Sequence, residues 1–209
     1  MIVFSGLDCS GKSTQIKNLA KHYSDIKKVR IIWSRGGYTP LIEYLKNIVK
    51  RGTQGGKSDL EYRNIVHSSN TKRKVLLWLA ILDLCIYYGL YFRFLKLTGV
   101  VIIADRYLQD TEIDFILKYN DVKFNDWLIW KLLDKIHCRS DVSFVLTVDP
   151  NESMRRSQLK EEPFPETLEE RQERLNLYYR HIDQKRWDYT IDANNSIDEV
   201  FDEIKRHMP

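Results

Sequence analysis

The sequence is poor in cysteine, carries little net charge and has no low-complexity tract. Its three cysteines among 209 residues, Cys9, Cys85 and Cys138, are scattered and form no CxxC pair. This pattern excludes a disulfide scaffold and a zinc ribbon, and it favours a reducing compartment. Lysine and arginine outnumber aspartate and glutamate by only 33 to 29, which gives a net charge of +4. That balance does not call for nucleic acid, and it fits a small anionic ligand bound by a local cluster of bases.

We also expect neither a secretion signal nor a membrane anchor. The chain opens on a short apolar run with no basic residue in it, and Asp8 follows closely, so we expect a cytoplasmic protein. The longest apolar stretch, residues 75–92, contains Asp83 and is followed by Arg93 and Lys96. Because a charge inside a bilayer is costly, we expect this stretch to be a buried core helix and not a transmembrane one.

Short apolar segments alternate with longer helical ones along the chain. The spacing predicts strands at residues 2–5, 29–33, 100–104, 142–148 and 189–191, and helices at residues 13–23, 41–49, 59–97, 111–119, 125–137, 151–160, 167–187 and 197–206. Strands that are apolar throughout and separated by helices predict a parallel sheet covered on both faces. The expected fold class is α/β, a three-layer αβα arrangement around a central five-stranded parallel sheet, with residues 1–209 in one domain.

A phosphate-binding motif lies between the first strand and the first helix. Residues 6–13 read GLDCSGKS, which matches the P-loop pattern in its strand–loop–helix setting. Glycines let backbone N–H groups turn inward around phosphate oxygens, and the following helix adds its positive N-terminus. Lys12 would bring an ammonium to the phosphates, and Ser13 would offer a hydroxyl to Mg²⁺. The alternative is an ordinary glycine turn. The residues expected to bind ATP are Gly6, Cys9, Ser10, Gly11, Lys12, Ser13 and Thr14.

An acidic and a basic residue follow the strand at 100–104. An acid at this strand end lies beside the P-loop, where Asp105 can hold Mg²⁺ through water. Arg106 comes directly after it and suggests a second anionic group to be clamped. The base-reading NKxD motif of a GTPase is absent from the sequence.

With these motifs the chain resembles the thymidylate kinases. Residues 4–14, FSGLDCSGKST, are similar to that family's opening FEGLDGAGKST, and residues 105–107 match its DRY motif. Residues 35–40, RGGYTP, resemble a shortened form of its Arg-Glu-Pro-Gly-Gly-Thr stretch. Residues 151–179 resemble its lid region, and residues 191–200 its C-terminal IDA…I..V pattern. The resemblance therefore covers essentially the whole chain.

The resemblance implies a P-loop kinase that uses ATP and Mg²⁺ to phosphorylate dTMP. Asp8 would accept a hydrogen bond from the sugar 3′-hydroxyl of the acceptor, and Arg35 and Arg106 would hold its 5′-phosphate, since the arginine fork suits phosphate. For the acceptor, the site residues implied are Asp8, Arg35, Trp78, Asp83, Arg106 and Tyr107. Ser13 and Asp105 are implied for the metal, and Ala193 is implied for ATP in addition to the P-loop residues.

The resemblance also implies a helical lid at about residues 151–175 that supplies a catalytic arginine. Phosphoryl transfer requires in-line positioning and neutralisation of charge more than covalent chemistry. In this family the arginine comes from the P-loop or from the lid, and the P-loop here has none. A solvated helix face is the alternative for any of the lid arginines. The catalytic set expected is Lys12, Arg106, Arg155 and Arg156, with Arg171 and Arg174 behind them.

Two segments depart from the family pattern. Thymidylate kinases carry an LLFAADR-like segment whose Phe stacks on thymine and whose Arg reads it, whereas residues 76–83 here read LLWLAILD. Trp78 can replace the Phe, but Leu82 or Asp83 stands where the Arg is expected, so Asp83 is either a core carboxylate or the reader of a different, donor-bearing base. In addition, Asp110 replaces a serine that often follows the DRY motif.

Three functions remain open at this point. The first is a dTMP kinase, the second a related kinase with another nucleotide or phosphorylated acceptor, and the third a nucleotide-binding module that has lost catalysis. The intact Lys12, Ser13, Asp105 and Arg106 argue against the third. The partners expected are a nucleoside monophosphate and, as in family members, a second copy of the chain bound through the apolar helix at 75–97, with no nucleic acid and no membrane.

Overall fold

A computed structural model describes residues 1–34, 70–160 and 166–208. Its five strands are β1 (Ile2–Gly6), β2 (Val29–Trp33), β3 (Val101–Asp105), β4 (Val142–Thr147) and β5 (Tyr189–Asp192). They form one sheet in the order β2-β3-β1-β4-β5, and all neighbouring strands are parallel. The predicted α/β class with a five-stranded parallel sheet is confirmed, and each predicted strand is found within about two residues of its expected ends.

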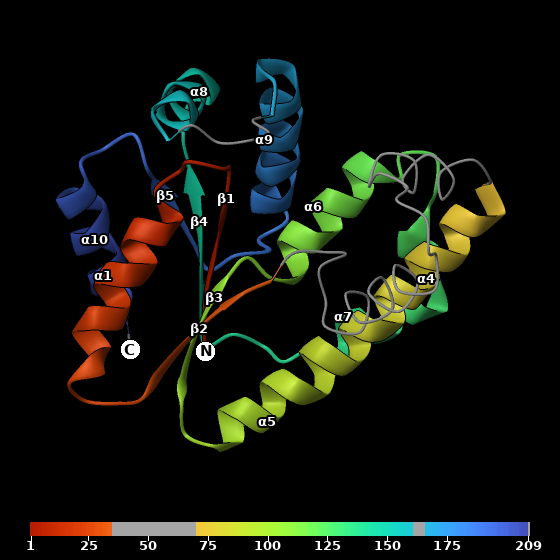
Figure 1. Ribbon diagram of the computed structural model, residues 1–209, viewed down its shortest axis with the longest axis horizontal. Helices are drawn as coiled ribbons and strands as arrows, with labels where there is room; N and C mark the ends of the chain where they lie inside the picture. Colours follow the sequence, from red (N-terminus) through yellow and green to blue (C-terminus); the bar gives the residue numbers. More distant parts are fainter. Residues whose placement is uncertain (35–69, 161–165, 209) are drawn as a thin grey trace, which may run out of the picture.

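Helices cover both faces of the sheet (Figure 1). On one face lie α1 (Lys12–Ser24) and α10 (Ile197–Arg206). On the other lie α4 (Asn70–Ile86), the π-helical turn η1 (Tyr87–Tyr91), α5 (Phe92–Leu97), α6 (Leu108–Lys118), the 3₁₀ turn η2 (Phe124–Asp126), α7 (Leu128–Ile136) and α9 (Leu168–Asp183). The helix α8 (Pro150–Leu159) follows β4 and lies beyond the carboxyl end of that strand. The helix expected at 41–49 is outside the described residues.

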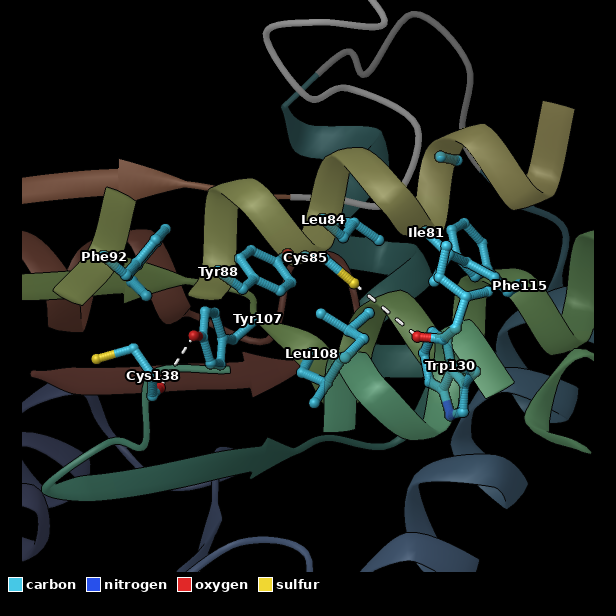
Figure 2. Packing of buried hydrophobic residues seen from close by; sticks show 14 of the residues in the cluster. Ile81, Leu84, Cys85, Tyr88, Phe92, Tyr107, Leu108, Phe115, Trp130 and Cys138 are labelled. Atoms are coloured by element: carbon cyan, nitrogen blue, oxygen red, sulfur yellow. Dashed lines mark hydrogen bonds between the residues drawn. The ribbon is translucent and has the colours of Figure 1, made fainter. Parts of the chain in front are cut away.

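The strands alternate their side chains between two hydrophobic layers. Val3 and Ile102 pack with α4, α5 and α7, whereas Phe4 and Ile103 pack on the opposite side with α1 and α10. Because both faces are covered, these strands are apolar at nearly every position. Figure 2 shows the first layer, in which the rings of Tyr88 and Tyr107 lie with their centroids 4.3 Å apart.

The apolar composition of residues 75–97 predicted a helix buried on all sides, but the structure buries only one side of it. Half of the most apolar window of the continuous helix 70–97 is buried, and large apolar side chains point outward along its other side. They recur at helical spacing as Val75, Leu79, Leu82, Ile86, Leu90, Phe94 and Leu97. The prediction fails because the sheet and α7 cover only one side of this helix. By length and hydropathy the helix is also a candidate membrane span, a test that core helices of soluble proteins pass as well.

The carboxyl ends of β1 and β3 lie side by side and lead into the two predicted motifs. Phe4 of β1 pairs with Asp105 of β3, and the chain continues from β1 into the loop before α1. In open parallel sheets ligands bind at this edge. The topology therefore brings the P-loop and the residues after β3 to one place.

Candidate functional site

The P-loop turns sharply between β1 and α1 through three residues with positive φ. These are Gly6 (φ +137°), Cys9 (φ +59°) and Gly11 (φ +90°). A Cβ on Gly6 would lie 2.3 Å from the carbonyl oxygen of Leu146 in β4, so only glycine fits there. Cys9 is not a glycine, and a left-handed residue of this kind marks a backbone that its surroundings hold against strain. These three residues therefore fix the backbone turn of the loop, which places Lys12 at the start of α1.

The ammonium of Lys12 is folded back onto the loop. Its Nζ donates to the carbonyl oxygens of Gly6 at 2.9 Å and Leu7 at 2.6 Å. Burial, followed by the nearby positive charge of Arg106, lowers the pKa of Lys12 to about 8. Its third contact is with the hydroxyl of Ser10 at 3.5 Å. A buried cation whose hydrogen bonds go to uncharged oxygens is prepared to bind an anion.

Asp105 lies at the end of β3 with one oxygen unused. Its Oδ1 is buried and has no hydrogen-bond partner within the described part of the chain. Burial raises the pKa of Asp105, although Lys12 and Arg106 act in the opposite direction. Mg²⁺ prefers oxygen ligands and is commonly bound by one or two carboxylates together with phosphates and water. The unused carboxylate oxygen, with the exposed Ser13 lining the same cavity, therefore fits the ion that the P-loop implies.

A small cavity of about 140 Å³ unites these residues. This volume suits phosphate groups, because pockets for whole ligands usually measure about 300–1,000 Å³. A larger hollow of about 460 Å³ lies between the end of α1 and the start of β2, at the opposite edge of the sheet. The residues lining the small cavity are Asp8, Cys9, Gly11, Lys12, Ser13, Thr14, Trp33, Asp105, Arg106 and Lys160.

Comparison with known proteins points to the family that the motifs resemble. The chain is similar to a thymidylate kinase of Plasmodium falciparum (isolate 3D7). The two are 24% identical over 209 residues, which cover 99% of this chain and 88% of that protein. No protein-family model matches the chain. The similarity extends over nearly the whole length of both chains and supports a thymidylate kinase-like family.

Three side chains hold the guanidinium of Arg106. Its Nη2 donates to Asp8, while its Nη1 donates to Asp110 and to the hydroxyl of Tyr178, both at 3.1 Å. Burial by itself lowers the pKa of Arg106, but Tyr178 and the carboxylates of Asp8 and Asp110 outweigh it and hold this pKa well above its usual value. Arg106 therefore stays charged, with one edge of its guanidinium at the cavity and the other in the interior.

Tyr107 and Ala193 are among the predicted site residues that do not line the cavity. Tyr107 points into the core, where its hydroxyl donates to the carbonyl oxygen of Cys138 at 2.9 Å (Figure 2). Burial raises its pKa far above the usual range for tyrosine. Ala193 is buried after β5, and its N–H donates to the carbonyl oxygen of Thr147 at 2.8 Å. In this structure Tyr107 and Ala193 support the elements that carry the site.

The structure does not bring the two predicted lid arginines to the cavity. Arg155 is 63% exposed and donates to Glu152, which is one turn earlier on α8. Arg156 donates to the same Glu152 and to the carbonyl oxygen of Ala193. Among the lid residues that the structure describes, Lys160, directly after α8, lines the cavity. The sequence offered no motif that would have singled it out.

The two arginines named behind them are buried in different surroundings. Arg174 pairs with Asp114 and Glu166. Arg171 donates to the hydroxyl of Ser153, which itself donates to the carbonyl oxygen of Asp8 in the P-loop. Through Ser153, α8 and α9 are thus attached to the backbone of the phosphate loop.

The predicted base-reading residues lie apart from the cavity. Trp78 is 45% exposed on α4, and Asp83 is buried on the same helix. Arg35 lies outside the described residues. Within residues 1–34, 70–160 and 166–208, the aromatic side chain that lines the cavity is Trp33 at the end of β2, and sequence reasoning missed it. An exposed strand-end tryptophan next to the phosphate loop is visible only once β2 is placed beside β3.

Proposed function

We propose that the protein is a nucleoside monophosphate kinase that uses ATP and Mg²⁺ to convert dTMP to dTDP. The observation that carries this proposal is the meeting of Lys12, Asp105 and Arg106 in one cavity at the carboxyl edge of the sheet. A nucleotide kinase is also what the similarity to a protein named thymidylate kinase suggests. A pure nucleotide-binding module has no need for an arginine beside the P-loop.

The residues of the cavity divide the work between donor and acceptor. The P-loop N–H groups would hold the phosphates of ATP, and the ammonium of Lys12 would exchange the carbonyl oxygens of Gly6 and Leu7 for phosphate oxygens. Asp105 and Ser13 would hold Mg²⁺, which when bound neutralises charge on the phosphoryl group that is transferred. Arg106 would hold the acceptor phosphate in line for attack.

We propose that the acceptor is a deoxynucleotide, and that the protein discriminates between bases less strongly than enzymes with the complete family pattern. Asp8 lines the cavity, where its carboxylate would accept a hydrogen bond from a sugar hydroxyl, but no arginine stands in the segment around Asp83. The loss of one charged hydrogen bond to a base forfeits about 1.5–3 kcal/mol, or roughly ten- to a hundredfold in discrimination. We therefore propose that dTMP is accepted but weakly selected.

A second candidate is a kinase on the same scaffold with another nucleotide or phosphorylated acceptor. It is favoured by Asp83, which is buried on α4 in the segment where Leu82 or Asp83 takes the place of the family's base-reading arginine. The two candidates share the donor site and differ only in the acceptor. Replacing Asp83 with Asn separates them, because the ranking among bases would change if Asp83 reads the base.

The test is a panel of nucleoside monophosphates, each incubated with ATP and Mg²⁺ and analysed for the diphosphate product. We expect product with dTMP and with at least one other deoxynucleotide. The control is Lys12→Ala, which should abolish transfer while its circular dichroism stays that of the wild type. If ATP binds and no monophosphate is phosphorylated, the proposed acceptor class is wrong.

We also propose that the protein is a cytoplasmic homodimer. Ile86, Leu90, Phe94 and Leu97 continue one exposed apolar stripe along η1 and α5, with Leu97 86% exposed. Contiguous apolar surface of this kind marks an interaction site on a protein. Pairing with a second copy, as implied by the resemblance to thymidylate kinases, would cover it.

A further inference from the structure

A buried hydrogen-bond network reaches from the P-loop through Arg106 to α9. Arg106 adopts a left-handed backbone conformation, with φ at +72°, and only 2% of its surface is exposed. Its backbone N–H donates to the carbonyl oxygen of Phe4 in β1 at 2.8 Å. A left-handed arginine persists only where its surroundings over-determine it, and such residues cluster at functional sites. The side chains that hold Arg106 in this conformation are those of Asp110 and Tyr178.

Asp110 is the centre of this network. It is completely buried on α6, one turn after Arg106, and each of its oxygens accepts two hydrogen bonds. Oδ1 accepts from Arg106 at 3.1 Å and from the hydroxyl of Tyr178 at 2.5 Å. Oδ2 accepts from the hydroxyl of Ser5 at 2.5 Å and from the backbone N–H of Tyr107 at 3.2 Å. With all four donors in place the carboxylate is fixed in position, and it fixes the edge of Arg106 that faces it.

Tyr178 brings α9 into the same network. Its hydroxyl accepts from Arg106, donates to Asp110, and lies 3.1 Å from the carbonyl oxygen of Gly6 in the P-loop. The residue is 72 positions from Arg106 and belongs to α9, which begins within the lid region expected at about residues 151–175. One side chain of α9 is thus in contact with both motifs of the site.

We propose that Asp110 and Tyr178 are positioning residues for the acceptor phosphate, an assignment that rests on the kinase function proposed above. They hold the Nη1 edge of Arg106, so that only the Nη2 edge, which contacts Asp8 beside the cavity, can change partner when a phosphate arrives. Because Tyr178 is part of α9 and its hydroxyl accepts from Arg106, the position of this helix determines the position of the guanidinium. A loss of the hydroxyl should therefore weaken binding of the acceptor and leave ATP binding unchanged.

The test compares Tyr178→Phe with Tyr179→Phe. The first removes the buried hydroxyl and keeps a ring beside Trp187, whose centroid is 5.7 Å away. The second removes the hydroxyl of the next residue on the same helix, whose side chain is 48% exposed. For Tyr178→Phe we expect the KM for dTMP to rise about tenfold with the KM for ATP within twofold of wild type. Tyr179→Phe should change neither constant.

Asp110→Asn provides a second readout from the other side of the network. Its amide cannot accept from all four donors, so we expect a rise in the acceptor KM at least as large as for Tyr178→Phe. Thermal unfolding of each variant shows whether the fold is retained.

The outcomes separate this inference from the proposed function. An active wild type with an unchanged dTMP KM in Tyr178→Phe overturns the positioning role and leaves the kinase function standing. The positioning role is also overturned if the KM for ATP rises as much as that for dTMP, because the network would then support the P-loop in general. A wild-type protein that phosphorylates no monophosphate refutes the proposed function and the positioning role together.

Discussion

Replacement of Gly6 by alanine tests the close packing of the P-loop against β4. Gly6 pairs with Leu146 in the sheet, and a Cβ there would lie 2.3 Å from the carbonyl oxygen of that residue. The positive φ of +137° costs a non-glycine residue about 1–3 kcal/mol. Forcing a methyl group against backbone costs typically another 1–3 kcal/mol. We expect Gly6→Ala to lower the free energy of unfolding by about 2–6 kcal/mol.

Gly11→Ala is the matched control in the same loop. Gly11 also has a positive φ, at +90°, but a Cβ there would meet no atom within 4 Å. Its cost is therefore backbone strain alone, about 1–2 kcal/mol. Urea unfolding followed by tryptophan fluorescence measures both variants against wild type. Equal losses for the two variants would refute the claim that the approach of Gly6 to Leu146, and not glycine flexibility in general, shapes this loop.

Three further predictions concern the lid, the acid stability and the assembly. Lys160→Gln should lower kcat/KM for ATP about ten- to a hundredfold, because it removes a charge from the phosphate cavity. Arg155→Gln is the control and should change kcat/KM less than twofold, because the exposed side chain of Arg155 pairs with Glu152. A larger loss for Arg155→Gln than for Lys160→Gln in steady-state kinetics would restore Arg155 as the catalytic residue. Burial lowers the pKa of His181 to about 4, so the unfolded chain takes up a proton near pH 6.5 while the folded protein stays neutral, and stability should fall by up to about 3 kcal/mol between pH 6.5 and pH 4. His181→Gln should flatten that part of the urea-midpoint profile, and an unaltered profile would show that other groups cause the acid loss. Phe94→Asp should convert a dimer to a monomer in sedimentation at micromolar concentration, and a monomeric wild type would contradict the proposed assembly.

The strands and the phosphate motif could be predicted from the sequence because both are local. Residues 100–104 are apolar throughout since both faces of β3 are covered, and a continuous apolar run records that directly. The P-loop is likewise a single stretch whose residue types follow from its backbone turn. Gly6, Gly11 and Lys12 could therefore be recognised without knowledge of the rest of the fold. The edge shared by β1 and β3 followed from their parallel order, which brought Asp105 to the P-loop as expected.

The tertiary structure decided which side chains of the motifs and the lid reach the cavity. Tyr107 follows Arg106 in the sequence, yet it points into the core because the backbone turns through a left-handed residue between the strand and α6. Arg155 and Lys160 have the same charge and lie five positions apart, but of the two only Lys160 lines the cavity. Tyr178 meets Arg106 across 72 positions, and no local pattern records a contact of that range. The sequence by itself therefore determined the class of fold and the phosphate loop, whereas the packing of α8 and α9 around that loop determined the rest of the site.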